Sequence, residues 1–305
     1  MKLVNQVTLV EVGPRDGLQN EKQPISAATK LELIHLLQAA GLREIEVTSF
    51  VNPKRVPQTA DNTEVMASVQ RKPGVRYSVL VPNMQGFEAA LACRADQIVV
   101  FSAASETFNQ RNINCSIDES IARFQPVVAA AHANGIKVRA AISCALGCPY
   151  QGDVSLDALE RVVRLMKGIG ADHCSVADTI GVGTPHHVQA AMERALKHFP
   201  LVEVSGHFHD TYGQALANIY ACLEMGIHTF DASVAGLGGC PFAQGATGNV
   251  ATEDVVFMLR GLGINTGVEL GPLMGAVRYI SGVLQRKPAS RAGNALLASR
   301  ARASA

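Results

Sequence analysis

Eight short runs rich in β-branched and other apolar residues alternate along this chain with longer stretches of helical periodicity. After the first run, for example, Leu33, Leu36 and Leu37 recur at the spacing of an amphipathic helix. Strands that alternate with helices form parallel sheets, and eight such units close into a (β/α)8 TIM barrel. We therefore predict an α/β chain with this fold. The predicted strands are residues 7–11, 44–48, 76–81, 97–101, 137–142, 173–176, 203–208 and 229–232.

The alternative arrangement is an open, doubly wound sheet. Such a sheet usually has fewer strands and carries a glycine-rich phosphate loop at a topological switch point. The segment after the first predicted strand reads VGPRDG and contains no G-x-G-x-x-G pattern, so the barrel is favoured.

The chain is predicted to be one catalytic domain over residues 1–305, with the barrel at about 4–262. A helical extension at about 263–290 is expected to pack near the barrel mouth. The last segment, 291–305, is rich in Ala, Ser and Arg, and we expect it to be frayed.

Composition argues against several classes of protein. The 305 residues carry a net charge of +1, which gives no broad attraction for nucleic acids or membrane surfaces. No apolar run reaches the roughly 18 residues of a membrane span. The seven cysteines are an odd number in a chain with no secretory signal, which favours free thiols in a reducing compartment. We expect a cytoplasmic protein, most simply a bacterial one, that binds neither nucleic acid nor membrane.

A glycine-dense segment at 233–254 contains a single cysteine, Cys240. Glycines free the backbone for close approach to a ligand but raise the entropy cost of ordering the segment, which favours a binding loop over a spacer. Cys240 is therefore a candidate acid/base, and the alternative is a buried structural thiol. The glycines are Gly236, Gly238, Gly239, Gly245 and Gly248.

Four side chains could together hold a divalent cation. His207 and His209 are two residues apart, which places both on one face of a strand. Asp16 would add a carboxylate and Asn249 an amide oxygen, a set that suits Mg²⁺ or Mn²⁺ with open positions for substrate oxygens. The alternatives are a hydrogen-bonded histidine pair at a strand end, and turn residues for Asp16 and Asn249.

Two further charged residues belong to the same end of the predicted barrel. Arg15 keeps its proton and could hold developing negative charge on an oxygen, or it could be a surface arginine. Glu46 falls inside the second predicted strand, where a carboxylate needs a partner, and Arg15 is the candidate. Active groups of TIM barrels lie at the carboxyl ends of the strands. The residues therefore suggest a metal-dependent enzyme with a cysteine acid/base.

These residues lie in segments that resemble the 3-hydroxy-3-methylglutaryl-CoA (HMG-CoA) lyase family of metal-dependent TIM barrels. The resemblance covers nearly the whole chain, and the Cys240 loop is its most specific part. The Arg-Asp-Gly and His-x-His pieces alone would indicate only the wider superfamily, which includes isopropylmalate and homocitrate synthases. The other matching segments are residues 10–20, 46–51, 112–116, 143–149, 178–185 and 261–267.

The resemblance implies a cleavage of HMG-CoA to acetyl-CoA and acetoacetate, expected in leucine degradation, by a homodimer or higher homo-oligomer. It implies Mg²⁺ or Mn²⁺ on Asp16, His207, His209 and Asn249. Arg15 would stabilise the enolate, and Glu46 would orient Arg15. Cys240 would act as acid/base on a mobile loop, with His207 also placed for proton transfer. Gln19, Gly239 and Asp178 would lie near the substrate.

Three alternatives stay open at this point. A lyase for a longer 3-hydroxy-3-alkylglutaryl-CoA, such as the isohexenyl homologue, would keep the same chemical groups and differ only in its pocket. A Claisen-type synthase of the superfamily is disfavoured by the Cys240 loop. A catalytically silent metal- or CoA-binding protein is disfavoured because every candidate catalytic group is present.

Overall fold

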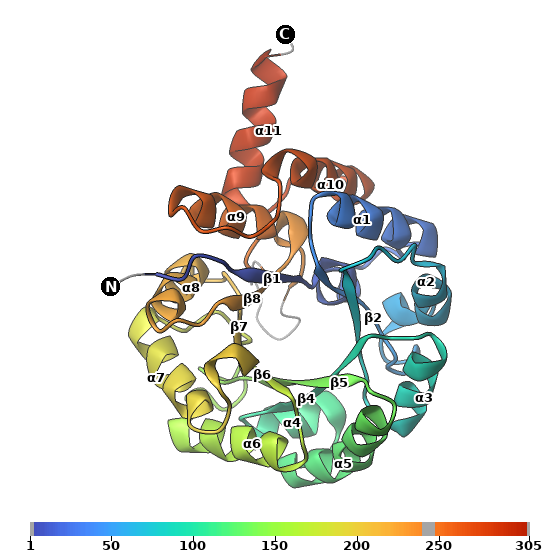
Figure 1. Cartoon of the computed structure of the whole chain (residues 1–305), viewed down its shortest axis with the longest axis vertical. Helices are drawn as coiled ribbons and strands as arrows, with labels where there is room; N and C mark the ends of the chain where they lie inside the picture. Colours follow the sequence, from blue (N-terminus) through green and yellow to red (C-terminus); the bar gives the residue numbers. More distant parts are fainter. Residues whose placement is uncertain (1–2, 240–247, 304–305) are drawn as a thin grey trace.

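The computed structural model describes residues 3–239 and 248–303. Within them, eight parallel strands close into a barrel in the order β1 to β8, with helices around the outside (Figure 1). The predicted TIM barrel is confirmed. The strands are β1 (Thr8–Glu11), β2 (Glu44–Ser49), β3 (Arg76–Leu80), β4 (Gln97–Ala103), β5 (Lys137–Ser143), β6 (His173–Asp178), β7 (Val204–Phe208) and β8 (Thr229–Ala232).

Every predicted strand is present, and the ends differ from the prediction by at most two residues. The largest differences are at the carboxyl ends of β4 and β6. Strand β6 continues to Asp178 because its last residues pair with β7, Ala177 with His207 and Asp178 with Phe208. This pairing depends on the neighbouring strand, which the local sequence does not reveal.

The helices begin where the sequence supplies caps. The hydroxyl of Ser26 accepts a hydrogen bond from the Thr29 amide at 3.2 Å, and Pro185 opens its helix. No helix within the described residues combines the length and apolar character needed to cross a bilayer. The helices are α1 (Ala27–Ala39), α2 (Asn62–Ser68), α3 (Met84–Ala92), α4 (Glu106–Ile113), α5 (Ile117–Ala133), α6 (Leu156–Gly168), α7 (Pro185–Leu196), α8 (Ala215–Glu224), α9 (Thr252–Gly261), α10 (Leu270–Val283) and α11 (Arg291–Ala303).

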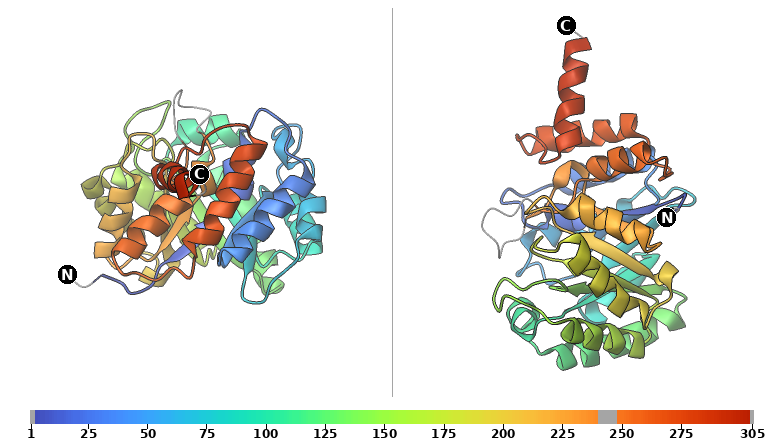
Figure 2. Two further views of the ribbon diagram at one scale, coloured as in Figure 1. Left: turned by 90° about the horizontal axis from the view of Figure 1, so that it is seen from above. Right: turned by 90° about the vertical axis from the view of Figure 1, so that its left-hand side faces the viewer.

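The C-terminal region adds two helices to the barrel. Helix α10 packs against α1 and α9, and it also contacts a short turn after β8, η4 (Val234–Gly236) (Figure 1). In the segment expected to be frayed, helix α11 forms and projects from the rest of the molecule (Figure 2). The carboxylate of Asp254 accepts from the amides of Arg291 and Ala292 at 3.1 and 2.6 Å. A cap supplied from another helix cannot be read from the composition of the tail.

Candidate active site

A cavity of about 670 Å³ opens at the carboxyl ends of the strands. Side chains from distant parts of the sequence converge on it, as expected for this fold. It brings together most of the side chains singled out in the sequence, namely Arg15, Asp16, Gln19, Glu46, His207 and His209, and the backbone of Gly239 also lines it. Cys240 lies outside the described residues.

Arg15 and Asp16 reach the cavity because the chain turns immediately after β1 into a single π-helical turn, η1 (Gly13–Gly17). The Nε atom of Arg15 donates to Glu46 Oε1 at 2.5 Å, and Nη1 donates to Asp16 Oδ1 at 2.7 Å. The pairing expected between Glu46 and Arg15 is therefore present. Burial opposes the charge of Arg15, but the two carboxylates outweigh burial and raise its pKa.

Asp16, His207 and His209 form a cluster suited to a metal ion. One potential ligand atom from each lies within 4.8 Å of the others. Burial would raise the pKa of Asp16, but Arg15 and the two histidines outweigh it and lower that pKa, so the carboxylate is charged. Burial, followed by the nearby His207, lowers the pKa of His209 to about 4, so this ring is neutral near pH 7.

Each histidine has a ring nitrogen that is available to bind a cation at this place. Nδ1 of His209 is buried and has no hydrogen-bond partner in the described part of the chain. Nδ1 of His207 is bonded to Asp231 Oδ2 at 3.0 Å, which leaves Nε2 as the ring nitrogen able to bind a metal. A charged carboxylate and two imidazoles are a donor set that fits a divalent metal ion.

Asn249 lies beside this cluster, but it presents its amide NH₂ group rather than its oxygen. An isolated antiparallel β-bridge between His209 and Asn249 places Asn249 beside the cluster. Its Nδ2 donates to Asp16 Oδ2 at 2.8 Å and to the carbonyl of Leu237 at 3.2 Å. Asn249 therefore holds Asp16 in this structure, and its role as a metal ligand stays a prediction.

Asp178 is placed differently from the expectation. Its side chain is fully buried, and its carboxylate accepts from the amides of Val182 and Gly183 at 3.2 and 2.8 Å. It does not line the cavity. In this structure the carboxylate closes the loop after β6, and the expected contact with substrate stays a prediction.

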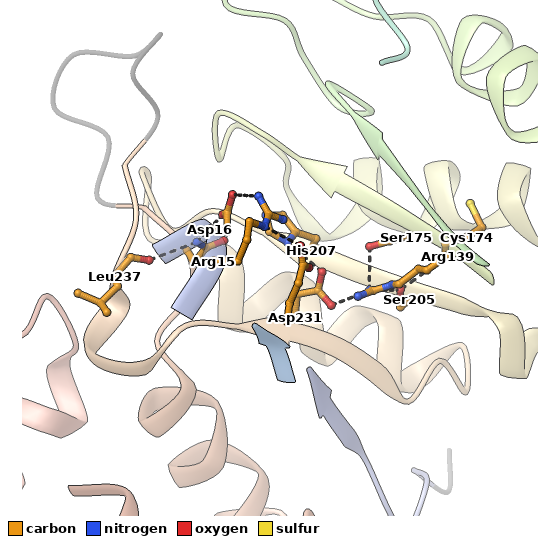
Figure 3. A network of polar contacts seen from close by, with 11 residues as sticks. Arg15, Asp16, Arg139, Cys174, Ser175, Ser205, His207, Asp231 and Leu237 are labelled. Atoms are coloured by element: carbon orange, nitrogen blue, oxygen red, sulfur yellow. Dashed lines mark hydrogen bonds and ion pairs between the residues drawn. The ribbon is translucent and has the colours of Figure 1, made fainter. Parts of the chain in front are cut away.

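Two residues of the site were missed by the sequence analysis, Arg139 on β5 and Asp231 on β8. Asp231 accepts from His207 on one oxygen and from Arg139 Nη2 on the other, at 2.6 Å (Figure 3). Each is a charged residue inside an apolar strand, the same signal that drew attention to Glu46. That signal could have found both residues.

Buried carboxylates also accept hydrogen bonds from the residues that flank the glycine-dense loop. Glu11 Oε1 accepts from the amides of Gly13 and Val234 at 2.8 and 2.9 Å, and Oε2 accepts from the Thr252 hydroxyl at 2.7 Å. Glu253 accepts from the Ala235 amide at 3.1 Å and from the Ser290 hydroxyl. These bonds fix the backbone on both sides of the loop.

The burial of Glu11 predicts a pH-dependent stability. Burial raises the pKa of Glu11 from 4.5 to about 7, so the folded state holds more protons than the unfolded state between these values. Stability is therefore lost as the pH rises through this window. Replacing Glu11→Gln should remove this loss, so that from pH 5 to pH 8 the variant gains about 2 kcal/mol relative to the wild type.

Urea unfolding of both proteins at pH 5 and pH 8 measures this difference. Glu88→Gln, at an exposed position of α3, is the matched control and should follow the wild type at both pH values. An equal pH dependence in the wild type and the Glu11→Gln variant would contradict the prediction.

Comparison with known proteins agrees with this geometry. The profile of the HMGL-like family matches residues 6–280. The 3-hydroxy-3-isohexenylglutaryl-CoA/hydroxymethylglutaryl-CoA lyase of Pseudomonas aeruginosa is 55% identical, over 98% of this chain and 99% of the relative. The mitochondrial hydroxymethylglutaryl-CoA lyase of Homo sapiens is 52% identical, over 96% of this chain and 90% of the relative.

A solved structure shows the same fold. The crystal structure of hydroxymethylglutaryl-CoA lyase from Pseudomonas aeruginosa superimposes with a TM-score of 0.95 at 55% identity, covering 98% of this chain and all of the other. The match extends over the whole barrel and is not confined to the cavity. On these grounds, the chain belongs to the HMGL-like family.

Proposed function

We propose that this chain is a carbon–carbon lyase that cleaves (S)-3-hydroxy-3-methylglutaryl-CoA to acetyl-CoA and acetoacetate. The observation that carries the proposal is the meeting of Asp16, His207 and His209 with the Arg15–Glu46 pair in one cavity. Its support is the identity above 50% to relatives with this named activity, over nearly the whole chain.

Asp16, His207 and His209 would hold a divalent cation, Mg²⁺ or Mn²⁺, with Asn249 as a fourth ligand after rotation of its amide. When bound, such a cation would polarise the substrate hydroxyl and a carboxylate oxygen, which eases loss of the hydroxyl proton. The neutral ring of His209 and the charged carboxylate of Asp16 are ready for this role without losing a proton.

Arg15 is placed to stabilise the negative charge that develops as the bond between C2 and C3 breaks. Its Nε and Nη1 atoms are held by Glu46 and Asp16, which leaves Nη2 to donate to the thioester oxygen of the enolate. Glu46 fixes the guanidinium plane, so little reorganisation is needed during the reaction. Gln19 and Gly239, which line the cavity, would contact the substrate.

Two proton transfers complete the proposed reaction. The C3 hydroxyl loses a proton as its carbon becomes the ketone of acetoacetate. Nε2 of His207 would be the acceptor when it is not bound to the cation, because Nδ1 already carries the proton that Asp231 accepts. The enolate carbon of the other fragment gains a proton to give acetyl-CoA, and the Cys240 thiol is the candidate donor.

A direct assay tests the proposal. The purified protein is incubated with HMG-CoA in EDTA, in Mg²⁺ and in Mn²⁺, beside a Cys240→Ser variant. We expect equal amounts of acetoacetate and acetyl-CoA with metal, none with EDTA, and a rate reduced at least a hundredfold in the variant because the hydroxyl is a far weaker acid. No acetoacetate in the presence of metal would overturn the proposal.

The comparisons do not favour the alternative activities. A parallel incubation with a 2-oxo acid and acetyl-CoA should therefore give no condensation product. The Pseudomonas aeruginosa relative is named for the isohexenyl substrate as well as HMG-CoA. Including the isohexenyl homologue in the assay measures whether the cavity here accepts the longer chain, with a lower kcat/KM expected than for HMG-CoA.

Cellular context follows from the same proposal. Within the described residues, Cys93, Cys115, Cys148, Cys174 and Cys222 are free thiols, which supports a reducing compartment such as the bacterial cytoplasm. HMG-CoA cleavage would place the protein in leucine degradation. As the family resemblance implies, we propose a homodimer or a higher homo-oligomer, which sedimentation of the purified protein would measure.

A further inference from the structure

A polar crossbar lies in the barrel interior beneath the cluster of Asp16, His207 and His209. It is formed by Arg139, whose side chain extends from β5 toward β8 (Figure 3). Its Nη2 atom donates to Asp231 Oδ1 at 2.6 Å, to Ser205 Oγ at 2.7 Å and to Ser175 Oγ at 3.0 Å. These four residues come from successive strands, β5 to β8, and all are nearly inaccessible to solvent.

Asp231 connects this crossbar to the cluster. It lies opposite His207 in the register of β7 and β8, and its second oxygen is 3.0 Å from Nδ1 of His207. A carboxylate only accepts hydrogen bonds, so the proton of the His207 ring stays on Nδ1. Nε2 then carries the lone pair, which is the form of the ring that binds a metal.

We propose that Asp231 and Arg139 are positioning residues of this enzyme: Asp231 fixes the tautomer and orientation of His207, and Arg139 fixes Asp231. The inference rests on the proposed metal-dependent function. Both residues line the cavity, but the role proposed here is exerted through the His207 ring. The pairing also explains a charged residue at each of two inward-facing positions, because either charge alone would be buried without a partner.

The orientation of the pair makes a specific test possible. In an Asp231→Asn variant, Arg139 still requires an acceptor, so the amide oxygen turns toward Arg139 and the NH₂ group toward His207. Nδ1 of His207 must then accept, and the ring proton moves to Nε2. This is the wrong tautomer for metal binding, although the shape of the side chain is almost unchanged.

Two measurements that do not depend on turnover detect this change in the His207 tautomer and its effect on metal binding. Nitrogen-15 NMR of the metal-free protein reports which ring nitrogen of His207 carries the proton, with His207→Gln identifying the signal. Mn²⁺ titration followed by electron paramagnetic resonance reports the affinity for metal. We expect the proton on Nδ1 in the wild type and on Nε2 in Asp231→Asn, with Mn²⁺ bound roughly 10- to 100-fold more weakly.

Changing both residues provides the rescue. In Asp231→Asn with Arg139→Gln, both side chains are amides that can rotate, so the Asn oxygen is free to face His207 again. The double variant should therefore recover the Nδ1 proton and bind Mn²⁺ more tightly than Asp231→Asn alone. A purely structural role would instead make the double variant worse than either single change.

The matched control is Asp172→Asn. Asp172 also accepts from a histidine and a cation, His132 at 2.9 Å and Lys137 at 2.8 Å, but on the protein surface. This variant should keep the wild-type Mn²⁺ affinity. Wild-type Mn²⁺ affinity in Asp231→Asn would overturn the proposal. A His207 proton on Nε2 in the wild-type protein would also overturn it, and that measurement does not require Asp231→Asn to fold. A chain that fails to cleave HMG-CoA yet shows the tautomer change would overturn the substrate assignment and leave this inference standing.

Discussion

Replacing Arg15→Lys is expected to lower kcat for HMG-CoA cleavage by roughly a thousandfold, with a much smaller change in KM. Lysine keeps the positive charge but has no planar group to satisfy Glu46, Asp16 and the substrate oxygen together. The loss should fall on kcat because the interaction with the enolate oxygen strengthens only as charge develops.

Steady-state kinetics of the purified variant, beside thermal unfolding, measure this effect. Arg76→Lys is the matched control. Arg76 is the first residue of β3, at the end of the barrel away from the cavity, and its Nη1 lies 3.4 Å from Glu44 Oε1. The control should keep the wild-type kcat. If Arg15→Lys instead raised KM with kcat unchanged, Arg15 would be a ground-state binding residue.

The second large effect is expected for Asp16→Asn. The lowered pKa of Asp16 means that this substitution removes a full negative charge from the cluster across the neutral pH range. Hard divalent cations depend on anionic oxygen ligands, so Mn²⁺ should bind at least a hundredfold more weakly, and cleavage at low metal concentration should be lost.

Mn²⁺ titration of the two proteins measures the affinity directly, and raising the Mn²⁺ concentration in the assay should recover part of the activity. Asp153→Asn, at an exposed position, is the control and should bind Mn²⁺ like the wild type. Unchanged Mn²⁺ affinity in Asp16→Asn would exclude Asp16 as a ligand and remove the basis for the proposed centre.

The parts of this structure that were predictable are those with local causes. Runs of β-branched residues give strands, and parallel strands share one carboxyl end, so Asp16, His207 and His209 could be expected at one mouth before their contacts were known. The Arg15–Glu46 pair was predictable because a carboxylate inside a barrel strand needs a cation.

The parts that were missed depend on contacts between distant segments. The crossbar of Arg139 requires the register of four strands, and only a closed barrel places Asp231 within its reach. Asp178 is an acidic residue at the carboxyl end of a strand, as a site residue would be. In the structure, however, its carboxylate accepts hydrogen bonds from the amides of the loop that follows it. Helix α11 depends on a cap from Asp254, which its own composition does not reveal.

The bonds of Glu11 have a consequence for synthesis of the chain. Its distant donors, Val234 and Thr252, lie 223 and 241 residues later in the sequence. At about 5–20 residues per second, a ribosome needs roughly 10–50 s to deliver them. During that time β8 is also absent, so one edge of β1 has no neighbour and is free to pair with another chain. This edge of β1 therefore gains its partner from its own chain only after β8 has been synthesised.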